Sequence, residues 1–148
     1  MVVRQAAIGF VVRTVRRSDF VRCVVLDRLT HSDPWKLPDY QAANRDQDTM
    51  ILVAALPAQY EFGEELIGVC VAEIEADDLH FHRLAVHPEW QRCGVGSALF
   101  SLSCRTIPSE HVFAEVPADS EPHLNFWSGI KFEHLPQRDR DGLCIYRR

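Results

Sequence analysis

One stretch in the middle of the chain constrains the fold most, because it reads as a strand, a loop with two glycines, a helix and a second strand. Residues 79–86 are mostly apolar and predict a strand, and residues 87–93 form a loop. Residues 94–106 predict a helix, since apolar side chains recur there at helical spacing, and residues 111–116 predict the next strand. This order indicates a βαβ unit, in which a helix connects two strands of one sheet.

The segments on either side of this unit predict the rest of the sheet. Further strands are expected at residues 8–15, 50–56, 66–74, 131–135 and 143–147, and further helices at residues 20–29 and 121–128. Residues 36–45 are compatible with a second short helix, and Ser18-Asp19 offers an N-cap to the helix that follows it. A mostly antiparallel first half followed by a βαβ unit predicts a mixed α/β (α+β) fold. Its central sheet would have about six to seven strands, with helices on both faces.

The length and charge of the chain limit what it can contain and bind. Its 148 residues are enough for one domain with a sizeable core and too few for two ordinary ones, so we expect a single domain over residues 1–148. Sixteen Lys and Arg against 21 Asp and Glu give a net charge of −5, which argues against a nucleic-acid partner. No apolar run approaches the roughly 20 residues of a membrane span, and the first residues read as a strand rather than a signal peptide. We therefore expect a cytoplasmic protein with no membrane partner.

The five cysteines support the same location. Their number is odd, their spacing is wide and no C-x-x-C pair exists, so neither a disulfide framework nor a zinc knuckle is expected. Buried apolar side chains in a reducing compartment explain them best, except for Cys93, which lies in the glycine loop. We expect no metal site.

The loop and helix start Gln91-Arg92-Cys93-Gly94-Val95-Gly96-Ser97 carries the strongest chemical signal. Glycines allow backbone N–H groups to approach the oxygens of a ligand, and the start of a helix offers unsatisfied N–H donors that suit a pyrophosphate. A Walker A loop would need a Gly-Lys-Ser/Thr ending, which is absent. A dinucleotide fingerprint would need a third glycine where Leu99 stands, although Glu115 falls about where a ribose-binding acid would. A glycine-rich helix start without a ligand is the remaining alternative.

The stretch from Arg83 to Gly96, RLAVHPEWQRCGVG, resembles the signature of the GNAT superfamily of N-acetyltransferases. That signature is a hydrophobic strand, a Val-x-Pro turn and then Gln/Arg-x-x-Gly-x-Gly/Ala. The likeness extends through Asn125-Phe126-Trp127 to Phe132, and the order of the earlier elements fits the same family.

The resemblance implies a GNAT fold and acetyl-CoA as the co-substrate. In this family the glycine loop holds the pyrophosphate, and the strand before it pairs its backbone with the pantetheine arm in the manner of an added strand. The corresponding positions are Gln91, Arg92, Cys93, Gly94, Val95, Gly96 and Ser97 in the loop and Leu84, Ala85 and Val86 in the strand.

Three residues are candidates for the base that deprotonates an amine. Glu115 lies in an otherwise apolar strand, where partial desolvation would raise its pKa. It also resembles the glutamate of the ribosomal-protein alanine acetyltransferases. His80 and His82 project from one face of their strand, and this strand resembles that of the arylalkylamine N-acetyltransferases, where such a pair serves as base. Purely structural roles remain the alternative for all three residues.

The expected acid departs from the family pattern. Trp127 stands where many members have a tyrosine that reaches the CoA sulfur, and an indole N–H cannot supply a proton. Ser120 replaces an asparagine and retains a hydroxyl for the pantetheine arm.

The acceptor is expected to bear a primary amine, on a small molecule or a peptide N-terminus. Its pocket would come from residues 34–45 and 57–65, with the acidic excess of the chain gathered on that side. The aromatic candidates are Trp35, Tyr40, Tyr60 and Phe62, and the acidic candidates are Asp39, Glu61, Glu64 and Glu65. The alternative is a non-catalytic module that binds acyl-CoA, and association into a homodimer is left open.

Overall fold

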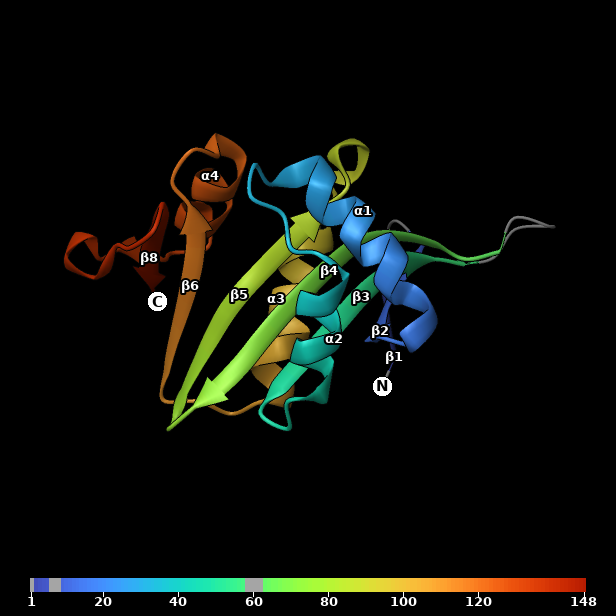
Figure 1. The fold of residues 1–148 in the computed structure, drawn as a ribbon, viewed down its shortest axis with the longest axis horizontal. Helices are drawn as coiled ribbons and strands as arrows, with labels where there is room; N and C mark the ends of the chain where they lie inside the picture. Colours follow the sequence, from blue (N-terminus) through green and yellow to red (C-terminus); the bar gives the residue numbers. More distant parts are fainter. Residues whose placement is uncertain (1, 6–8, 58–62) are drawn as a thin grey trace.

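A computed structural model of the chain describes residues 2–5, 9–57 and 63–148 and is built on one twisted sheet (Figure 1). The strands are β1 (Val2–Gln5), β2 (Phe10–Thr14), β3 (Thr49–Leu56), β4 (Glu65–Glu75), β5 (Asp78–Val86), β6 (His111–Pro117), β7 (Glu133–His134) and β8 (Leu143–Arg147). The helices are α1 (Phe20–Thr30), α2 (Leu37–Arg45), α3 (Val95–Thr106) and α4 (Glu121–Gly129), with single 3-10 turns at Arg17–Asp19, Pro88–Trp90 and Pro136–Arg138.

The strand order is β1-β2-β3-β4-β5-β6-β8-β7, and the mixed sheet flanked by helices that the sequence predicts is confirmed. Every neighbouring pair is antiparallel except β5 and β6, which are parallel and joined through α3. The described residues form eight strands rather than seven, because the lead-in to β2 folds back as β1 and pairs with it antiparallel.

The parallel pair β5 and β6 stays together over only half its length. Its ladder runs from Asp78 opposite His111 to Phe81 opposite Ala114, and the two strands then diverge toward their C-terminal ends (Figure 1). A bulge opposite Val71 and Ala72 of β4 falls at His82 and bends β5 where the separation begins. The C-terminal half of β5 therefore has a backbone edge that β6 does not cover.

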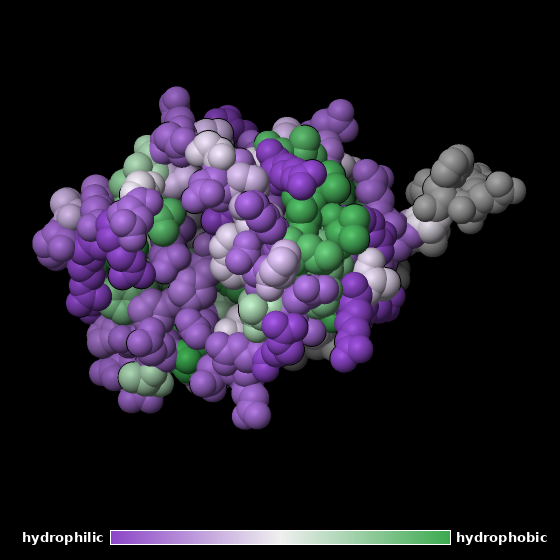
Figure 2. Space-filling view, viewed as in Figure 1, coloured by the Kyte–Doolittle hydropathy of each residue, from purple (hydrophilic) through white to green (hydrophobic). Residues whose placement is uncertain are grey.

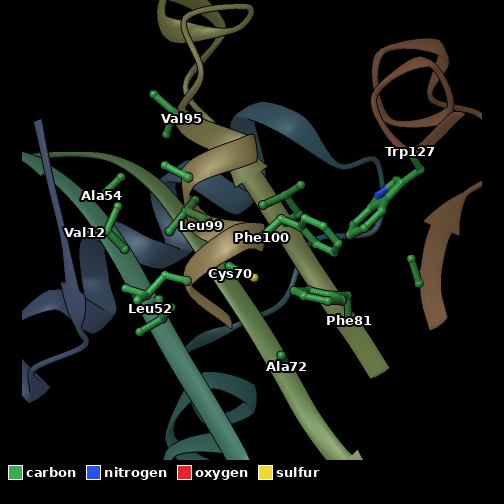
Figure 3. Packing of buried hydrophobic residues seen from close by; sticks show 14 of the residues in the cluster. Val12, Leu52, Ala54, Cys70, Ala72, Phe81, Val95, Leu99, Phe100 and Trp127 are labelled. Atoms are coloured by element: carbon green, nitrogen blue, oxygen red, sulfur yellow. The ribbon is translucent and has the colours of Figure 1, made fainter. Parts of the chain in front are cut away.

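Helices cover both faces of the sheet. In Figure 1, α1 and α2 lie in front of the strands and α3 lies behind them. The layer against α3 and α4 contains Phe81, Phe100 and Trp127 in mutual aromatic contact (Figure 3). α3 packs close to β4 because Gly68 has no side chain there: a Cβ would lie 2.9 Å from Val95 Cγ1.

A buried polar network fixes α1 against β5. Asp27 is fully buried and accepts hydrogen bonds from the Tyr40 hydroxyl at 2.5 Å and from the guanidinium of Arg83, and His31 Nδ1 lies 3.2 Å from it. Burial opposes the charge of Asp27, but His31 and Arg83 outweigh it and lower its pKa to about 2. Tyr40 and Arg83 thus serve to orient the elements around β5.

The start of α1 differs from the expected capping arrangement. Asp19 precedes α1, but its side chain makes no capping bond to the helix. Its buried carboxylate instead accepts from the Arg13 guanidinium at 2.7 Å and from the Arg16 backbone N–H at 2.7 Å. Pairing the buried guanidinium of Arg13 prevails over capping, because an unpaired buried charge would cost more.

Part of the apolar surface of α1 lies on the outside of the molecule. Val21, Val25 and Leu29 expose 66%, 50% and 50% of their surface, and Figure 2 shows an apolar patch over this helix. No helix within the described ranges is long and apolar enough to cross a membrane. All five cysteines are free; Cys23 and Cys70 are buried, and Cys93 is exposed.

Candidate functional site

The glycine loop adopts a backbone that few other residues tolerate. Gly94 precedes the first residue of α3 with φ of +85°, and Arg92 has φ of +62°. The first turn of the helix leaves N–H groups without acceptors within the helix and carries the positive end of its dipole. The loop therefore places N–H donors at the start of α3.

Gly96 has a packing reason as well. A Cβ at this position would lie 2.9 Å from Cε1 of Phe126, so α4 approaches α3 closely at this point. The Gly-x-Gly signal thus combines a left-handed backbone at Gly94 with a close approach of two helices at Gly96.

A cavity of about 580 Å³ opens between the free edge of β5, the glycine loop and α4. It is lined by Leu84, Val86, Trp90, Gln91, Arg92, Gly94, Gly96, Ser97, Glu121, Pro122, His123, Asn125, Phe126, Gly129 and Ile130. Gln91 closes the end of β5 by donating its amide to the Val86 carbonyl at 3.3 Å. The cavity combines helix N–H donors with an exposed strand edge and an apolar wall.

A second cavity of about 320 Å³ lies against β6 and β8, beside the part of β5 that is still paired with β6. Its lining residues are His80, Phe113, Ala114, Glu115, Arg138, Arg140 and Ile145. His80 stacks on the Phe113 ring at a centroid distance of 5.2 Å.

Glu115, which lines this second cavity, begins a chain of charged groups across three strands. Its Oε1 lies 3.1 Å from Nδ1 of His82 and accepts from Arg140 Nη2 at 3.0 Å. The other ring nitrogen of His82, Nε2, lies 2.8 Å from Oε1 of Glu73 on β4. The side chains of His82 and Glu73 are 24% and 29% exposed, so the chain leads from the cavity to solvent. We call these three residues, Glu115, His82 and Glu73, the relay.

The relay shifts the protonation of its members in opposite directions. Burial works against the imidazolium of His82, but Glu115 and Glu73 outweigh it and raise its pKa. Burial also works against the carboxylate of Glu115, but His82 and Arg140 outweigh it and lower its pKa. The expected upward shift at Glu115 is thus wrong, because two positive partners accompany the desolvation.

Comparison with known proteins decides the family. A family profile described as Acetyltransferase (GNAT) domain matches residues 48–128, more than half of the chain. The chain belongs to the GNAT acetyltransferases. No curated protein sequence matches it.

Solved structures share the fold of this GNAT domain at low sequence identity. NAA60 from Arabidopsis thaliana in complex with acetyl-CoA is 17% identical with a TM-score of 0.75, covering 94% of this chain and 97% of that one. The ribosomal-protein-S18-alanine N-acetyltransferase from Escherichia coli is 16% identical with a TM-score of 0.70, covering 93% and 90%. The PaiA N-acetyltransferase from Thermoplasma acidophilum in complex with coenzyme A is 14% identical with a TM-score of 0.73, covering 94% and 98%.

The GNAT fold brings seven of the predicted cofactor residues to the larger cavity. Those that line it are Leu84, Val86, Gln91, Arg92, Gly94, Gly96 and Ser97. Ala85 and Val95 are buried in the two cores, and Cys93 is exposed outside the lining. Alternation along β5 turns Ala85 to the opposite face, toward α1 and α2.

Trp127 does not line the cavity. It is 2% exposed, and its ring lies 4.8 Å from that of Phe132 and 5.4 Å from that of Phe81. An indole buries more apolar surface than a phenol and fills the space between α4 and the sheet, so the structure places it in the core (Figure 3).

His123 lines the cavity and was not indicated by the sequence reasoning. Its Nε2 lies 3.0 Å from the Leu84 carbonyl, which only accepts, so Nε2 carries the proton and Nδ1 accepts from the Ser120 hydroxyl at 2.6 Å. Burial, together with the nearby His31, lowers the pKa of His123 to about 4. Ser120 therefore orients the His123 ring through Nδ1. The sequence signals His123 only by its position, one helical turn before Trp127 on α4.

The residues expected to receive the acceptor mostly have structural roles. Tyr40 is buried on Asp27, Asp39 accepts from the Lys36 N–H at 2.8 Å at the start of α2, and Glu64 pairs with Arg13. Tyr60, Glu61 and Phe62 lie outside the described residues. The Trp35 ring lies 5.5 Å from the Arg83 guanidinium and packs on Tyr40.

One group of metal-type donors occurs within the described ranges. The donor atoms of His134, Asp139 and Cys144 lie within 4.8 Å of one another, at the β7–β8 hairpin. His134 Nε2 is 2.8 Å from the Asp139 carboxylate, so these two side chains already pair without an ion.

Proposed function

We propose that this chain is an acetyl-CoA-dependent N-acetyltransferase that moves an acetyl group directly to a primary amine of a small molecule or a peptide. The observation that carries the proposal is the divergence of β5 from β6, which leaves a free edge of β5 beside a cavity with helix N–H donors, while a second cavity with a carboxylate lies against β6. Membership of the GNAT family supports it, as do neighbours whose structures hold acetyl-CoA or coenzyme A.

The larger cavity fits the co-substrate. We propose that the N–H groups of Gly94, Gly96 and Ser97 hold the pyrophosphate, with Arg92 adding a charge-assisted contact. The free edge of β5 at Leu84 and Val86 would pair with the amides of the pantetheine arm. In this structure His123 donates a hydrogen bond to the Leu84 carbonyl. This bond must break before the pantetheine arm can pair with the same carbonyl.

The relay accounts for the proton that the acceptor must lose. The nitrogen lone pair of the neutral amine attacks the thioester carbonyl carbon, the carbon–sulfur bond breaks and CoA leaves with the electron pair as a thiolate. Glu115 faces the cavity, takes the proton of the amine and passes it through His82 to Glu73 and solvent. His80 then shapes the pocket rather than moving the proton, since its ring stacks on Phe113.

The leaving group needs no acid from Trp127. A thiol has a pKa of about 8.5, so a thiolate is a stable leaving group near neutral pH. Trp127 is accordingly free to serve the core.

A non-catalytic acyl-CoA-binding module is the second candidate. It is favoured by the absence of a hydroxyl at Trp127 and by the occupation of the Leu84 carbonyl by His123. Thermal-shift and thiol-release assays with acetyl-CoA and a panel of amines separate the two. Stabilisation with thiol release on an amine supports the enzyme, stabilisation without release on any amine supports the module, and no stabilisation contradicts both.

Two broader expectations also stand as proposals. We propose that residues 1–148 act as one domain, because all the described strands join one sheet and both cavities are lined by residues of β5. We further propose a cytoplasmic location, in which the five free cysteines stay reduced.

A further inference from the structure

We propose that the acceptor carries an anionic group beside its primary amine, and that Arg138 and Arg140 form the subsite for this group. The inference rests on the proposed function, because it takes Glu115 as the residue that meets the amine. It adds the chemical class of the acceptor: a zwitterionic amine, supplied by a free amino acid or by a peptide with an acidic residue next to its N-terminus.

The charges of the smaller cavity carry the inference. Of the described residues that line it, Glu115 is the one carboxylate, and it shares the lining with Arg138 and with Arg140, which donates to it. An acceptor whose only charge is an ammonium group would lie near two guanidiniums and one carboxylate, so it would face net repulsion. An acceptor that adds an anion provides the arginines with a partner and leaves Glu115 for the amine.

Contacts with Phe113 and Glu115 hold the two arginines at the cavity and leave guanidinium N–H groups free to bind a ligand. The guanidinium carbon of Arg138 lies 5.0 Å above the centre of the Phe113 ring, which fixes its side chain on the cavity wall. Arg140 donates to Glu115 at 3.0 Å, but its side chain is 62% exposed, against 17% for Glu115. Most of the Arg140 side chain is open to solvent, so its remaining N–H donors are accessible to a ligand.

The hairpin between β7 and β8 holds this arrangement without using either arginine side chain. Asp141 and Gly142 have φ of +47° and +76°, and Arg140 and Leu143 exchange backbone hydrogen bonds of 3.1 Å and 2.7 Å around them. This is the two-residue hairpin turn that positive φ at both positions produces. The Asp139 carboxylate anchors the loop further, since it accepts the Ile145 N–H at 2.9 Å.

The size and polarity of the site limit the acceptor. At about 320 Å³, the cavity holds a small amine or the first residues of a peptide rather than a bulky ligand. Contact between Arg140 and Glu115 at 3.0 Å places the two halves of the subsite side by side. The amine and the anion of the acceptor must therefore lie within about one residue of each other. The net charge of the chain, −5, makes two arginines at one small cavity a local feature rather than a general basic surface.

The test compares acceptors that differ only in the anionic group. One arm uses tyrosine against tyramine, and the other uses peptides with Glu, Gln or Lys as the second residue and an otherwise identical sequence. We expect kcat/KM to be roughly tenfold or more higher for the anionic member in at least one arm, and the arm that responds identifies the source of the acceptor. Equal kcat/KM within both arms, or preference for the neutral or basic member, overturns the proposal.

Variants locate the effect. Arg138→Gln and Arg140→Gln should raise KM for the anionic acceptor and remove the preference, whereas Arg105→Gln on the exposed side of α3 should leave the preference intact. Loss of rate on all acceptors by the same factor would contradict a subsite and indicate a general role of these arginines.

A binding arm separates this proposal from the proposed function. Fluorescence anisotropy with labelled Glu- and Gln-containing peptides, in the presence of CoA, reports the subsite whether or not acetyl transfer occurs. If the Glu peptide binds more tightly than the Gln peptide, and Arg138→Gln abolishes this difference, the anionic subsite is supported even if no amine is acetylated. Equal binding of the two peptides contradicts it even if acetyl transfer is active.

Discussion

The Glu115 carboxylate has a lowered pKa although it lies on a largely apolar strand. Burial raises its pKa, but His82 and Arg140 reverse the net direction. The lowered pKa keeps Glu115 ionised at neutral pH, which is the form that can accept a proton. The raised pKa of its neighbour His82 makes that imidazole a stronger base once it has lost its proton.

Glu115→Gln and His82→Ala should therefore lower kcat about 10²- to 10⁴-fold, the range for losing a positioned acid or base, while the thermal shift with acetyl-CoA is retained. His80→Ala should instead raise KM with a smaller effect on kcat, because His80 lines the pocket. Glu75→Gln at the exposed end of β4 is the matched control. Steady-state kinetics check these outcomes, and full activity in Glu115→Gln would remove this residue from the mechanism.

The pH profile tests the far end of the relay. His82 must lose a proton to pass one on, so kcat/KM should rise with pH through a pKa above the ordinary 6.5. Glu73→Gln removes a carboxylate that holds the imidazolium, so the acidic limb of the profile should move to lower pH. An unchanged limb in Glu73→Gln would mean that the proton takes another route.

The buried ring of Trp127 should contribute to the stability of the fold. Trp127→Ala should destabilise the fold by about 3–5 kcal/mol, since a fully buried ring leaves a cavity. Trp127→Phe keeps an aromatic ring in the cluster and should retain acetyl transfer. Urea denaturation and thiol release measure the two effects, and loss of transfer in a well-folded Trp127→Phe would return this residue to the active site.

The sequence predicted Glu115 and His82 because a charged residue in an apolar strand and a His-x-His pair are visible along the chain. Glu73, Arg140 and His123 could not be predicted in the same way, because their roles depend on pairing between segments. Glu73 reaches His82 through the register of β4 with β5 and the bulge between them, and Arg140 reaches Glu115 across β8. Periodicity along one strand specifies a face but not the neighbour across it.

At the scale of elements, the sequence predicted the helices and strands closely. The apolar runs and the glycine loop place α3 and the strands on either side of it, whereas β1 was missed because it has only four residues. α1 also carries apolar residues that the fold leaves exposed, because an apolar run in a helix does not require that every one of its residues is buried.

The joint between α1 and β5 should depend on Asp27. Asp27→Asn leaves Arg83 buried without its charge partner and should destabilise the fold by about 3–5 kcal/mol. Because the pKa of Asp27 is lowered in the folded state, its contribution is present above the ordinary 3.8 and lost as the pH falls toward 2. Urea denaturation between pH 7 and pH 2 checks this: the difference between wild type and Asp27→Asn should shrink over that lower window, and a difference independent of pH would contradict it.

At the scale of the whole molecule, the acidic excess was expected on the side of residues 34–45 and 57–65, and this stays a prediction. The cavity at Glu115 differs locally from the net charge of the chain, because two arginines and one carboxylate line it. Composition specifies how many charges a chain has, whereas the fold determines which of them meet. The family was accessible from one local motif, whereas the arginines proposed to select the acceptor lie by a hairpin near the C-terminal end and could not be placed from the sequence.

Acetyl-CoA in the larger cavity and a primary amine in the smaller cavity should react in a single acetyl transfer. The most direct measurement incubates the protein with acetyl-CoA and the acceptor panel, counting free CoA thiol and acetylated amine in the same reaction by mass spectrometry. The account predicts one thiol released for each N-acetylated amine, with both products lost in Glu115→Gln. Stabilisation by acetyl-CoA without an acetylated product on any primary amine would contradict it.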